Sequence, residues 1–426
     1  MNDVTDLGLG ERTTPAGSAQ PNRAALAGVR IADLTQYEAG PSCTEILAWL
    51  GAEVIKVEEP TKGEIGRHGS TDKPGADGAY FLILNANKCS VTANLKEEQG
   101  RDLLRRLIAK SDVFIENFGP GTIERLGFDY EAVARINPAI IYAQIKGFAS
   151  DGPNANFPCL DILAQAAGGV MSMTGERNGR PLIAGAHVGD TGSGLHCAIG
   201  ILAALYQRQF TGQGQRIEIA MQEAVIGLSR AKYAAQALVG PGEAVKRSGN
   251  SSGRHVYAPC DVYPCKGGGL NDYCYVYIKG AKIRPWENLL RIVGREDLIG
   301  NPQFATPKLR VERLDEVNEI VAQWTRQHDK RHVMKTFMEV GVYASAVMDT
   351  RDLLDDPHLK KRGAFVTVDH PVRGEFTIPG CPIKMSGSPV EVKAAPLLGA
   401  DNNDVYGKLL GIPADELAAL REQKII

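Results

Sequence analysis

Apolar residues in the first part of the chain alternate between short continuous runs and longer segments with helical spacing. Runs at 29–34 and 54–57 flank the segment 43–50, in which the apolar residues have helical spacing. Pro41 is typical of a helix start, and Gly51 is typical of a helix end. A strand, a helix and a strand at this minimal spacing predict a β-α-β unit with parallel strands.

The same alternation continues to about residue 240. Further strands are expected at 113–115, 140–145 and 215–220, and helices at 99–110, 195–209 and 222–238. Strands and helices that alternate in this way predict a large doubly wound, Rossmann-like α/β domain. In such a domain, ligands bind beyond the carboxyl ends of the strands.

The pattern changes near residue 239, where glycine, proline, serine and cysteine become frequent. A strand is expected at 273–279, a hairpin turn at Gly267–Gly269, and several helices up to about residue 340. The predicted organisation is a disordered tail at 1–24, the first part of the large domain at 25–225, a linker helix at 226–244, a small α+β domain at 245–340 and a return to the large domain at 341–426.

Composition narrows the possible partners and location. A chain of 426 residues exceeds what one hydrophobic core normally serves, which agrees with two domains. The net charge of -2 gives no overall reason for nucleic-acid binding, and we see no run of about 20 apolar residues that would span a membrane. The polar N-terminus and eight dispersed cysteines predict a cytoplasmic protein without a metal site.

The most informative segment is 184–195, AGAHVGDTGSGL. We expect a strand to deliver Asp190 into a glycine-rich turn just before the helix at 195–209. A helix N-terminus favours a charged carboxylate, so we expect a low pKa for Asp190. An ionised carboxylate open to substrate can act as a covalent nucleophile. Helix capping by Asp190 or Ser193 is the simpler alternative on spacing alone.

The chain resembles the class III CoA-transferases (CaiB/BaiF type), and in particular those that act on formyl-CoA and oxalate. The segments that carry the resemblance are 39–58, 85–91, 116–128, 145–148, 189–196, 200–224 and 395–399. The resemblance implies that Asp190 attacks an acyl-CoA and forms first an acyl-aspartyl anhydride and then an aspartyl-CoA thioester. It implies coenzyme A as a substrate, no permanently bound cofactor, and a homodimer of interlocked rings.

The resemblance also suggests residues that bind coenzyme A. Arg125 and Lys146 are expected near it, and Asn117 and Phe118 are expected to line its pocket. For Arg125 and Lys146, ordinary solvated surface charge is the alternative. The segment 85–91 supplies two weaker candidates, Asn87 and Lys88, and Lys88 could equally be a charge at a strand edge.

Three departures from the formyl-CoA:oxalate pattern bear on the substrate. Glu38 stands where those proteins have glutamine, and a second carboxylate near the acyl group repels a dianion unless it is protonated or faces a basic partner. The loop 247–259 lacks their four-glycine run, although Gly249 could still cover the active site. After the segment 395–399, Asp401 and Asn402 occupy the positions where many relatives have glutamate and histidine. Succinyl-CoA with another small dicarboxylate is therefore an alternative to formyl-CoA with oxalate.

Three other functions compete with CoA transfer. An α-methylacyl-CoA racemase needs a histidine at the position of Leu160, and leucine cannot exchange a proton. His187 and His196 lie near Asp190 in the sequence but not at that position, and His196 is expected to pack within its helix. A nucleotide-binding oxidoreductase would carry G-x-G-x-x-G after the first strand, and this chain does not. A non-catalytic paralogue that binds acyl-CoA remains the third alternative.

Overall fold

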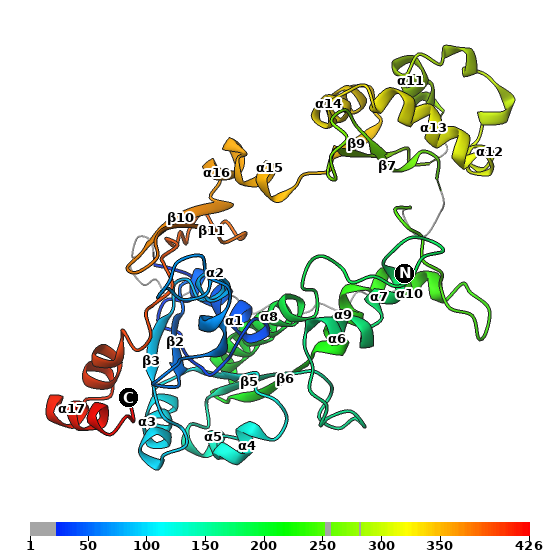
Figure 1. The fold of residues 1–426 in the computed structure, drawn as a ribbon. Helices are drawn as coiled ribbons and strands as arrows, with labels where there is room; N and C mark the ends of the chain where they lie inside the picture. The colour runs from blue at the N-terminus through cyan, green and yellow to red at the C-terminus, as the bar shows by residue number, and fades with distance from the viewer. Residues whose placement is uncertain (1–22, 252–256, 281–282) are drawn as a thin grey trace, which may run out of the picture.

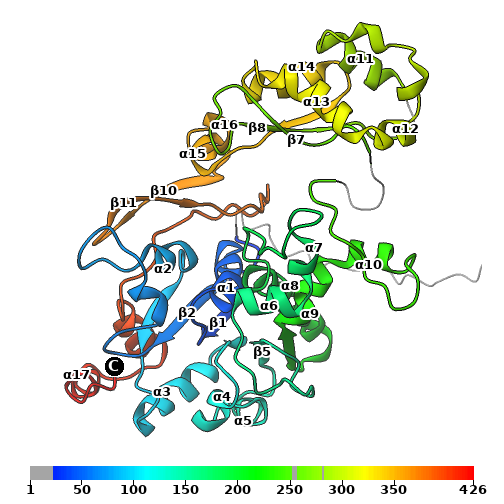
Figure 2. The same cartoon turned by 45° about the vertical axis from the view of Figure 1, so that its right-hand side comes forward.

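The computed structural model describes residues 23–251, 257–280 and 283–426. The predicted tail lies almost wholly outside these residues, as does part of the loop 247–259. The chain folds into two lobes joined by two connections (Figures 1 and 2). The large lobe contains residues 23–236 and 365–426, and the small lobe contains residues 258–346.

A parallel sheet forms the centre of the large lobe. Its strands are β1 (Arg30–Asp33), β2 (Glu53–Glu58), β3 (Cys89–Thr92), β4 (Val113–Glu116), β5 (Ile141–Lys146) and β6 (Gln215–Ala220). Their order is β3-β2-β1-β4-β5-β6, and every neighbouring pair is parallel. The predicted α/β class with a parallel sheet is confirmed. The strand order reverses between β1 and β4, which is where such sheets bind ligands.

Helices cover both faces of this sheet. They are α1 (Ala39–Trp49), α2 (Ala79–Leu84), α3 (Glu98–Ile108), α4 (Thr122–Leu126), α5 (Tyr130–Ile136), α6 (Asp161–Ala167), α7 (Val170–Met173), α8 (Asp190–Thr211), α9 (Met221–Leu228) and α10 (Arg230–Gln236), with a 3₁₀ turn η1 (Ile65–His68). Cys43 and Leu47 of α1 pack with Cys197 and Ile201 of α8 on one face. A Cβ atom on Gly194 would lie 2.2 Å from Ser42 Oγ, so the close approach of α1 and α8 requires glycine there.

The C-terminal part of the chain returns to the large lobe. Helices α15 (Thr350–Leu354) and α16 (Pro357–Lys361) lead to the antiparallel pair β10 (Phe365–His370) and β11 (Gly374–Pro379). Val368 and Ile378 of this pair pack with Trp49. The π-helix η4 (Asn403–Leu409) and α17 (Ala414–Glu422) then complete the core on the α3 and α5 face.

The small lobe has its own hydrophobic core around Trp286, Phe304 and Phe337. Its antiparallel sheet contains β7 (Cys260–Pro264), β8 (Tyr273–Tyr277) and β9 (Tyr343–Ala346). Its helices are α11 (Arg284–Ile292), α12 (Pro307–Glu312), α13 (Leu314–Thr325) and α14 (Lys330–Glu339), with 3₁₀ turns η2 (Glu296–Leu298) and η3 (Pro302–Phe304). The glycines at 267–269 lie in the β7–β8 hairpin connection, as predicted. The expected division of the chain at residues 24, 225, 244 and 340 stays a prediction.

Two local expectations are wrong. The helix expected over 222–238 is interrupted at Ser229 and forms α9 and α10, which agrees with the weak helix propensity of Gly227 and Ser229. No strand precedes Asp190: residues 174–189, all of them described, contain only turns, bends and irregular segments and do not pair with a sheet. In the described part of the chain, no helix combines the length and the apolar character that crossing a bilayer requires.

Candidate active site

The carboxyl ends of β1, β4 and β5 converge on one cavity of about 610 Å³. Residues 36–39 follow β1, residues 117–120 follow β4, and Lys146 ends β5. Residues 157–162, His187 and Asp190 close the opposite wall. The cavity therefore lies at the point where the strand order reverses, which is the expected ligand position in this fold.

Asp190 is the first residue of α8 and is 8% exposed in the cavity wall. The backbone amides of Gly189 and Asp190 both donate to Asp161 Oδ1, at 2.8 and 3.1 Å. Ser193 Oγ donates to the carbonyl of Gly189. Asp161 thus satisfies the amides at the start of α8, whereas Asp190 and Ser193 do not cap the helix. The alternative of capping by these two residues is wrong.

The pKa of Asp190 is raised to about 7, so the expectation of a low pKa is also wrong. Burial is the largest cause, and the nearby carboxylates of Glu38 and Asp161 add to it, while His187 acts in the opposite direction. The helix N-terminus does not compensate, because its first amides hydrogen-bond to Asp161. Asp161 was not recognised as functional from the sequence, since its partners are 28 and 29 residues away.

Glu38, which precedes the first residue of α1, is a third carboxyl group near Asp190 and Asp161. One carboxylate oxygen lies 2.6 Å from His187 Nδ1, and the other accepts a 2.7 Å hydrogen bond from Thr191 Oγ1. The hydrogen bond to Glu38 is the main reason why the pKa of His187 is raised. His187 is therefore the basic partner that Glu38 faces. His196, in contrast, bonds the carbonyl of Gly192 within its own helix, as expected.

The turn that carries Glu38 is held from two sides. Asn117 accepts from the amide of Gln36 at 2.7 Å and donates to the carbonyl of Gln36 at 2.9 Å. Tyr37 has a left-handed backbone with φ of 67°, and its amide donates to the buried Glu64 carboxylate at 2.8 Å. Because a left-handed tyrosine costs about 1–3 kcal/mol, these bonds are needed to hold Glu38 in place.

Two of the predicted coenzyme A residues line the cavity together with Asn117. Phe118 contributes an apolar surface, and Lys146 lies beside it. Lys146 Nζ is 2.8 Å from Glu116 and 2.7 Å from the carbonyl of Phe118, so its charge already has a partner. Arg125 is exposed on α4, where it donates to Thr122 Oγ1, and it does not line the cavity.

The two weaker candidates lie outside the cavity and bind other parts of the chain. Asn87 exchanges hydrogen bonds with the backbone of Glu391 and Lys393. Lys88 is buried, and its Nζ donates to the carbonyl of Pro41 and to Asn85 Oδ1. Burial lowers the pKa of Lys88 to about 8. Lys88 is therefore not a solvated charge at a strand edge.

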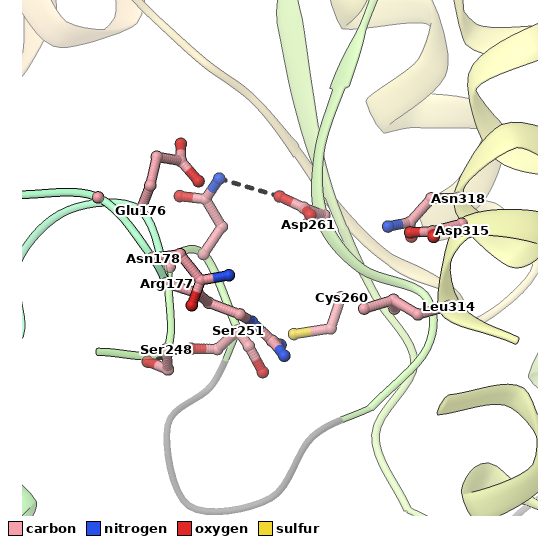
Figure 3. A pocket seen from close by; sticks show the side chains of 13 residues that line it. Glu176, Arg177, Asn178, Ser248, Ser251, Cys260, Asp261, Leu314, Asp315 and Asn318 are labelled. Carbon is pink, nitrogen blue, oxygen red and sulfur yellow. Dashed lines mark hydrogen bonds between the residues drawn. The ribbon is translucent and has the colours of Figure 1, made fainter. Parts of the chain in front are cut away.

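Gly249 lies at a different cavity, of about 340 Å³, which does not include Asp190 (Figure 3). Residues 176–179 and 248–251 form one wall, and residues of the small lobe form the other. Asn250 Nδ2 donates to Asp261 Oδ1 at 2.9 Å across this cavity. Within the described residues, no group of three or more histidine, cysteine or acidic side chains is arranged to hold a metal ion.

Comparisons with known proteins agree with this geometry. The profile of CoA-transferase family III matches residues 26–402. A formyl-CoA:oxalate CoA-transferase of Streptomyces coelicolor is 43% identical over 413 residues, which are 94% of this chain and 99% of that protein. A protein of the same name from Bradyrhizobium is 40% identical, over 93% of this chain and 96% of its own length. A CaiB/BaiF family protein from Brucella suis has a TM-score of 0.82 and 30% identity, over 91% of this chain and all of that one.

Proposed function

Because the chain belongs to CoA-transferase family III, we propose that it transfers coenzyme A between two carboxylic acids with Asp190 as the nucleophile. The observation that carries the proposal is the position of Asp190, a carboxylate in the wall of the cavity at the strand-order reversal. The names of the relatives support formyl-CoA as donor and oxalate as acceptor. Succinyl-CoA with another small dicarboxylate is the alternative pair that the experiment includes.

The proposed reaction proceeds through an anhydride and then a thioester of the Asp190 side chain. The carboxylate attacks the acyl carbonyl, and coenzyme A leaves as thiolate, so an acyl-aspartyl anhydride forms. The thiolate then attacks the Asp190 carbonyl and releases the first acid, which leaves an aspartyl-CoA thioester. The acceptor acid displaces the thiolate to form a new anhydride. The thiolate finally attacks the acceptor's acyl carbon, the bond from that carbon to the Asp190 oxygen breaks, and the new acyl-CoA and the free Asp190 carboxylate are formed.

We propose that Phe118, Asn117 and Lys146 position coenzyme A, since they line the cavity that contains Asp190. Arg125 lies on α4, which follows the cavity-lining residues 117–120. We propose that it binds the phosphates of coenzyme A that lie farther from Asp190. Asn87 and Lys88 support the fold around α1 and the C-terminal segment. A covering role for Gly249 stays a prediction, because the cavity that it lines here is a separate one.

The experiment traps the anhydride or thioester of Asp190 on the protein. The protein is incubated with formyl-, acetyl- or succinyl-CoA, with and without oxalate or another small acid, and then treated with hydroxylamine. We expect mass spectrometry to find a hydroxamate on Asp190, and new acyl-CoA to form only when an acceptor is present. Solvent deuterium entering the α-carbon of a branched acyl-CoA without an adduct would indicate a racemase, and binding without turnover would indicate the non-catalytic paralogue.

The raised pKa of Asp190 gives a pH prediction. Since the nucleophile must be ionised, the rate of Asp190 acylation should rise with pH through about 7 and reach a plateau above it. Glu38→Gln removes a neighbouring negative charge that raises this pKa. We therefore expect its acylation profile to shift to lower pH. Stopped assays of hydroxamate formation between pH 5 and 9 measure this, and an unshifted profile would contradict the proposed charge coupling.

We also propose that the protein is cytoplasmic and acts as a homodimer of interlocked rings, without a permanently bound cofactor. The chain leaves the large lobe after α10 and returns to it through α15 and α16, so the two lobes are connected at two separate points of the chain (Figure 1). One face of α8 exposes Leu195, Ile199, Tyr206 and Phe210 at helical spacing, with Phe210 72% exposed. A second copy of the chain is the partner that we propose for this face.

The double variant Ile199→Asp with Phe210→Asp tests the dimer. Two buried charges destabilise an interface strongly, so we expect the variant, when refolded from urea, to remain a monomer at micromolar concentration by light scattering. Leu270→Asp is the matched control, because Leu270 is 97% exposed on the small lobe. A variant that stays dimeric would place the subunit interface elsewhere.

A further inference from the structure

We propose that His187 binds the carboxylate of the acceptor acid through its Nε2–H and that Glu38 holds the imidazole ring for this purpose. The inference rests on the proposed function and adds a substrate-binding residue to it. His187 lines the same cavity as Asp190, and its side chain is 50% exposed. The 2.6 Å contact between Nδ1 and Glu38 fixes the ring and leaves Nε2 as the nitrogen available to a ligand.

The charges around the nucleophile show why such a residue is needed. Asp190, Glu38 and Asp161 bring three carboxyl groups to one wall, and an acceptor acid adds a fourth. Among the described residues that line the cavity, the basic side chains are Lys146 and His187. Lys146 is already bound to Glu116 and to the carbonyl of Phe118. His187 is thus the basic lining residue whose exposed ring keeps a second nitrogen, Nε2, for a ligand.

The protonation state of the ring decides whether it can bind an anion. A neutral ring that donates Nδ1–H to Glu38 presents a lone pair at Nε2, which repels a carboxylate. The imidazolium instead presents Nε2–H, a charge-assisted donor. The carboxyl groups of Glu38, Asp161 and Asp190 all face His187 and raise its pKa, against the opposing effect of partial burial. Acceptor binding should therefore weaken as the pH rises through the pKa of His187.

The bound acceptor is placed for the third step of the reaction. One of its carboxylate oxygens forms a bond to Cγ of the aspartyl-CoA thioester, the Cγ–S bond breaks, and the electron pair leaves with sulfur as the coenzyme A thiolate. The product is a new anhydride, and no proton or oxidant is consumed. His187 binds the acid before this attack, so its loss should affect the acceptor rather than the acyl-CoA donor.

The test uses the variant His187→Gln and measures two half-reactions separately: the acylation of Asp190 by acyl-CoA and the transfer of coenzyme A to the acceptor acid. We expect the KM for the acceptor to rise about 10- to 100-fold, the loss typical of one charge-assisted hydrogen bond. At a pH on the plateau of the acylation profile, where Asp190 is ionised, the KM for acyl-CoA and the rate of hydroxamate formation on Asp190 should change less than about twofold. In the native protein the acceptor KM should rise with pH, and in His187→Gln it should not. His196→Gln is the matched control, because that ring bonds its own helix.

A second variant tests the charge itself. His187→Lys supplies a cation whose ordinary pKa is about 10.4, so acceptor binding should be partly restored and should persist to higher pH. An unchanged acceptor KM in His187→Gln would overturn the inference. Equal losses in both half-reactions would also overturn it, because the ring would then support Asp190 or the departing thiolate. The absence of any Asp190 adduct in the native protein would instead overturn the proposed function.

Discussion

Asp190→Asn should reduce kcat/KM for CoA transfer at least about 10³-fold, the scale seen when a covalent nucleophile is removed. An amide has nearly the same shape as the carboxylate but does not attack a thioester, so neither the anhydride nor the aspartyl-CoA ester can form. The measurement is chromatographic detection of new acyl-CoA, with hydroxylamine trapping in parallel. Activity above about a tenth of the native level would place the covalent step on another residue.

The same variant should fold as well as the native protein. Because burial and the neighbouring carboxylates raise the pKa of Asp190, its ionised form destabilises the folded state at pH values above its ordinary range. A neutral amide removes that repulsion, so we expect no decrease in Tm at pH 8. Asp404→Asn, at an exposed aspartate, serves as the control for both assays. Lost activity together with a lower Tm would indicate a folding defect and leave the nucleophile to be identified by trapping.

The local pattern of the sequence was sufficient for five of the six strands of the parallel sheet, all except β3. The strand predicted at 215–220 is observed as β6 with the same bounds, and the predicted β-α-β unit forms β1, α1 and β2. These elements are specified by residues close in sequence, namely apolar runs, helical spacing and a glycine at a helix end. The pairing of β1 with β4 joins distant segments, and spacing along the chain does not determine it.

The sequence singled out Asp190, which lies in the cavity wall, but it did not predict the electrostatic environment of this residue. Asp190 was found through a motif that is continuous in sequence. Its pKa depends on Asp161 and Glu38, which belong to α6 and the start of α1 and reach Asp190 only in the folded chain. The contact of Glu38 with His187 joins residues 149 positions apart. Lys88 shows the same limit, since its burial follows from the packing of α1 rather than from its neighbours in sequence.

Arg67→Met should have the largest effect on stability, a decrease of about 3–5 kcal/mol in the free energy of unfolding. Arg67 forms a bidentate pair with Glu58, with both nitrogen–oxygen distances 2.7 Å, and both side chains are buried. It also bonds Asp77 at 2.8 Å, and its guanidinium lies 3.8 Å from the centre of the Phe81 ring. Methionine fills a similar volume but leaves the Glu58 carboxylate buried without its main partner.

The pH dependence identifies the cause of this loss. Burial alone would raise the pKa of Glu58, but hydrogen bonds and charge from Arg67, with Lys56 and Ser90, hold it below its ordinary value. The stability that this group contributes is present above its unfolded-state pKa, 4.5, and is lost as the pH falls through the folded-state value. In Arg67→Met the burial effect dominates, the folded-state pKa rises, and the ionised group destabilises the protein at neutral pH.

Urea unfolding at pH 7 and at pH 4 therefore distinguishes ion pairing from simple loss of packing. We expect the difference between native protein and Arg67→Met to be largest at pH 7 and to shrink at pH 4, where Glu58 of the variant is protonated. Glu58→Gln combined with Arg67→Met should recover part of the loss, because the unpaired charge is removed. Arg351→Met is the control, since its pair with Asp355 is exposed on α15 and should contribute little. A difference that is equal at both pH values would mean that Arg67 stabilises the lobe through packing on Phe81 rather than through the charge of Glu58.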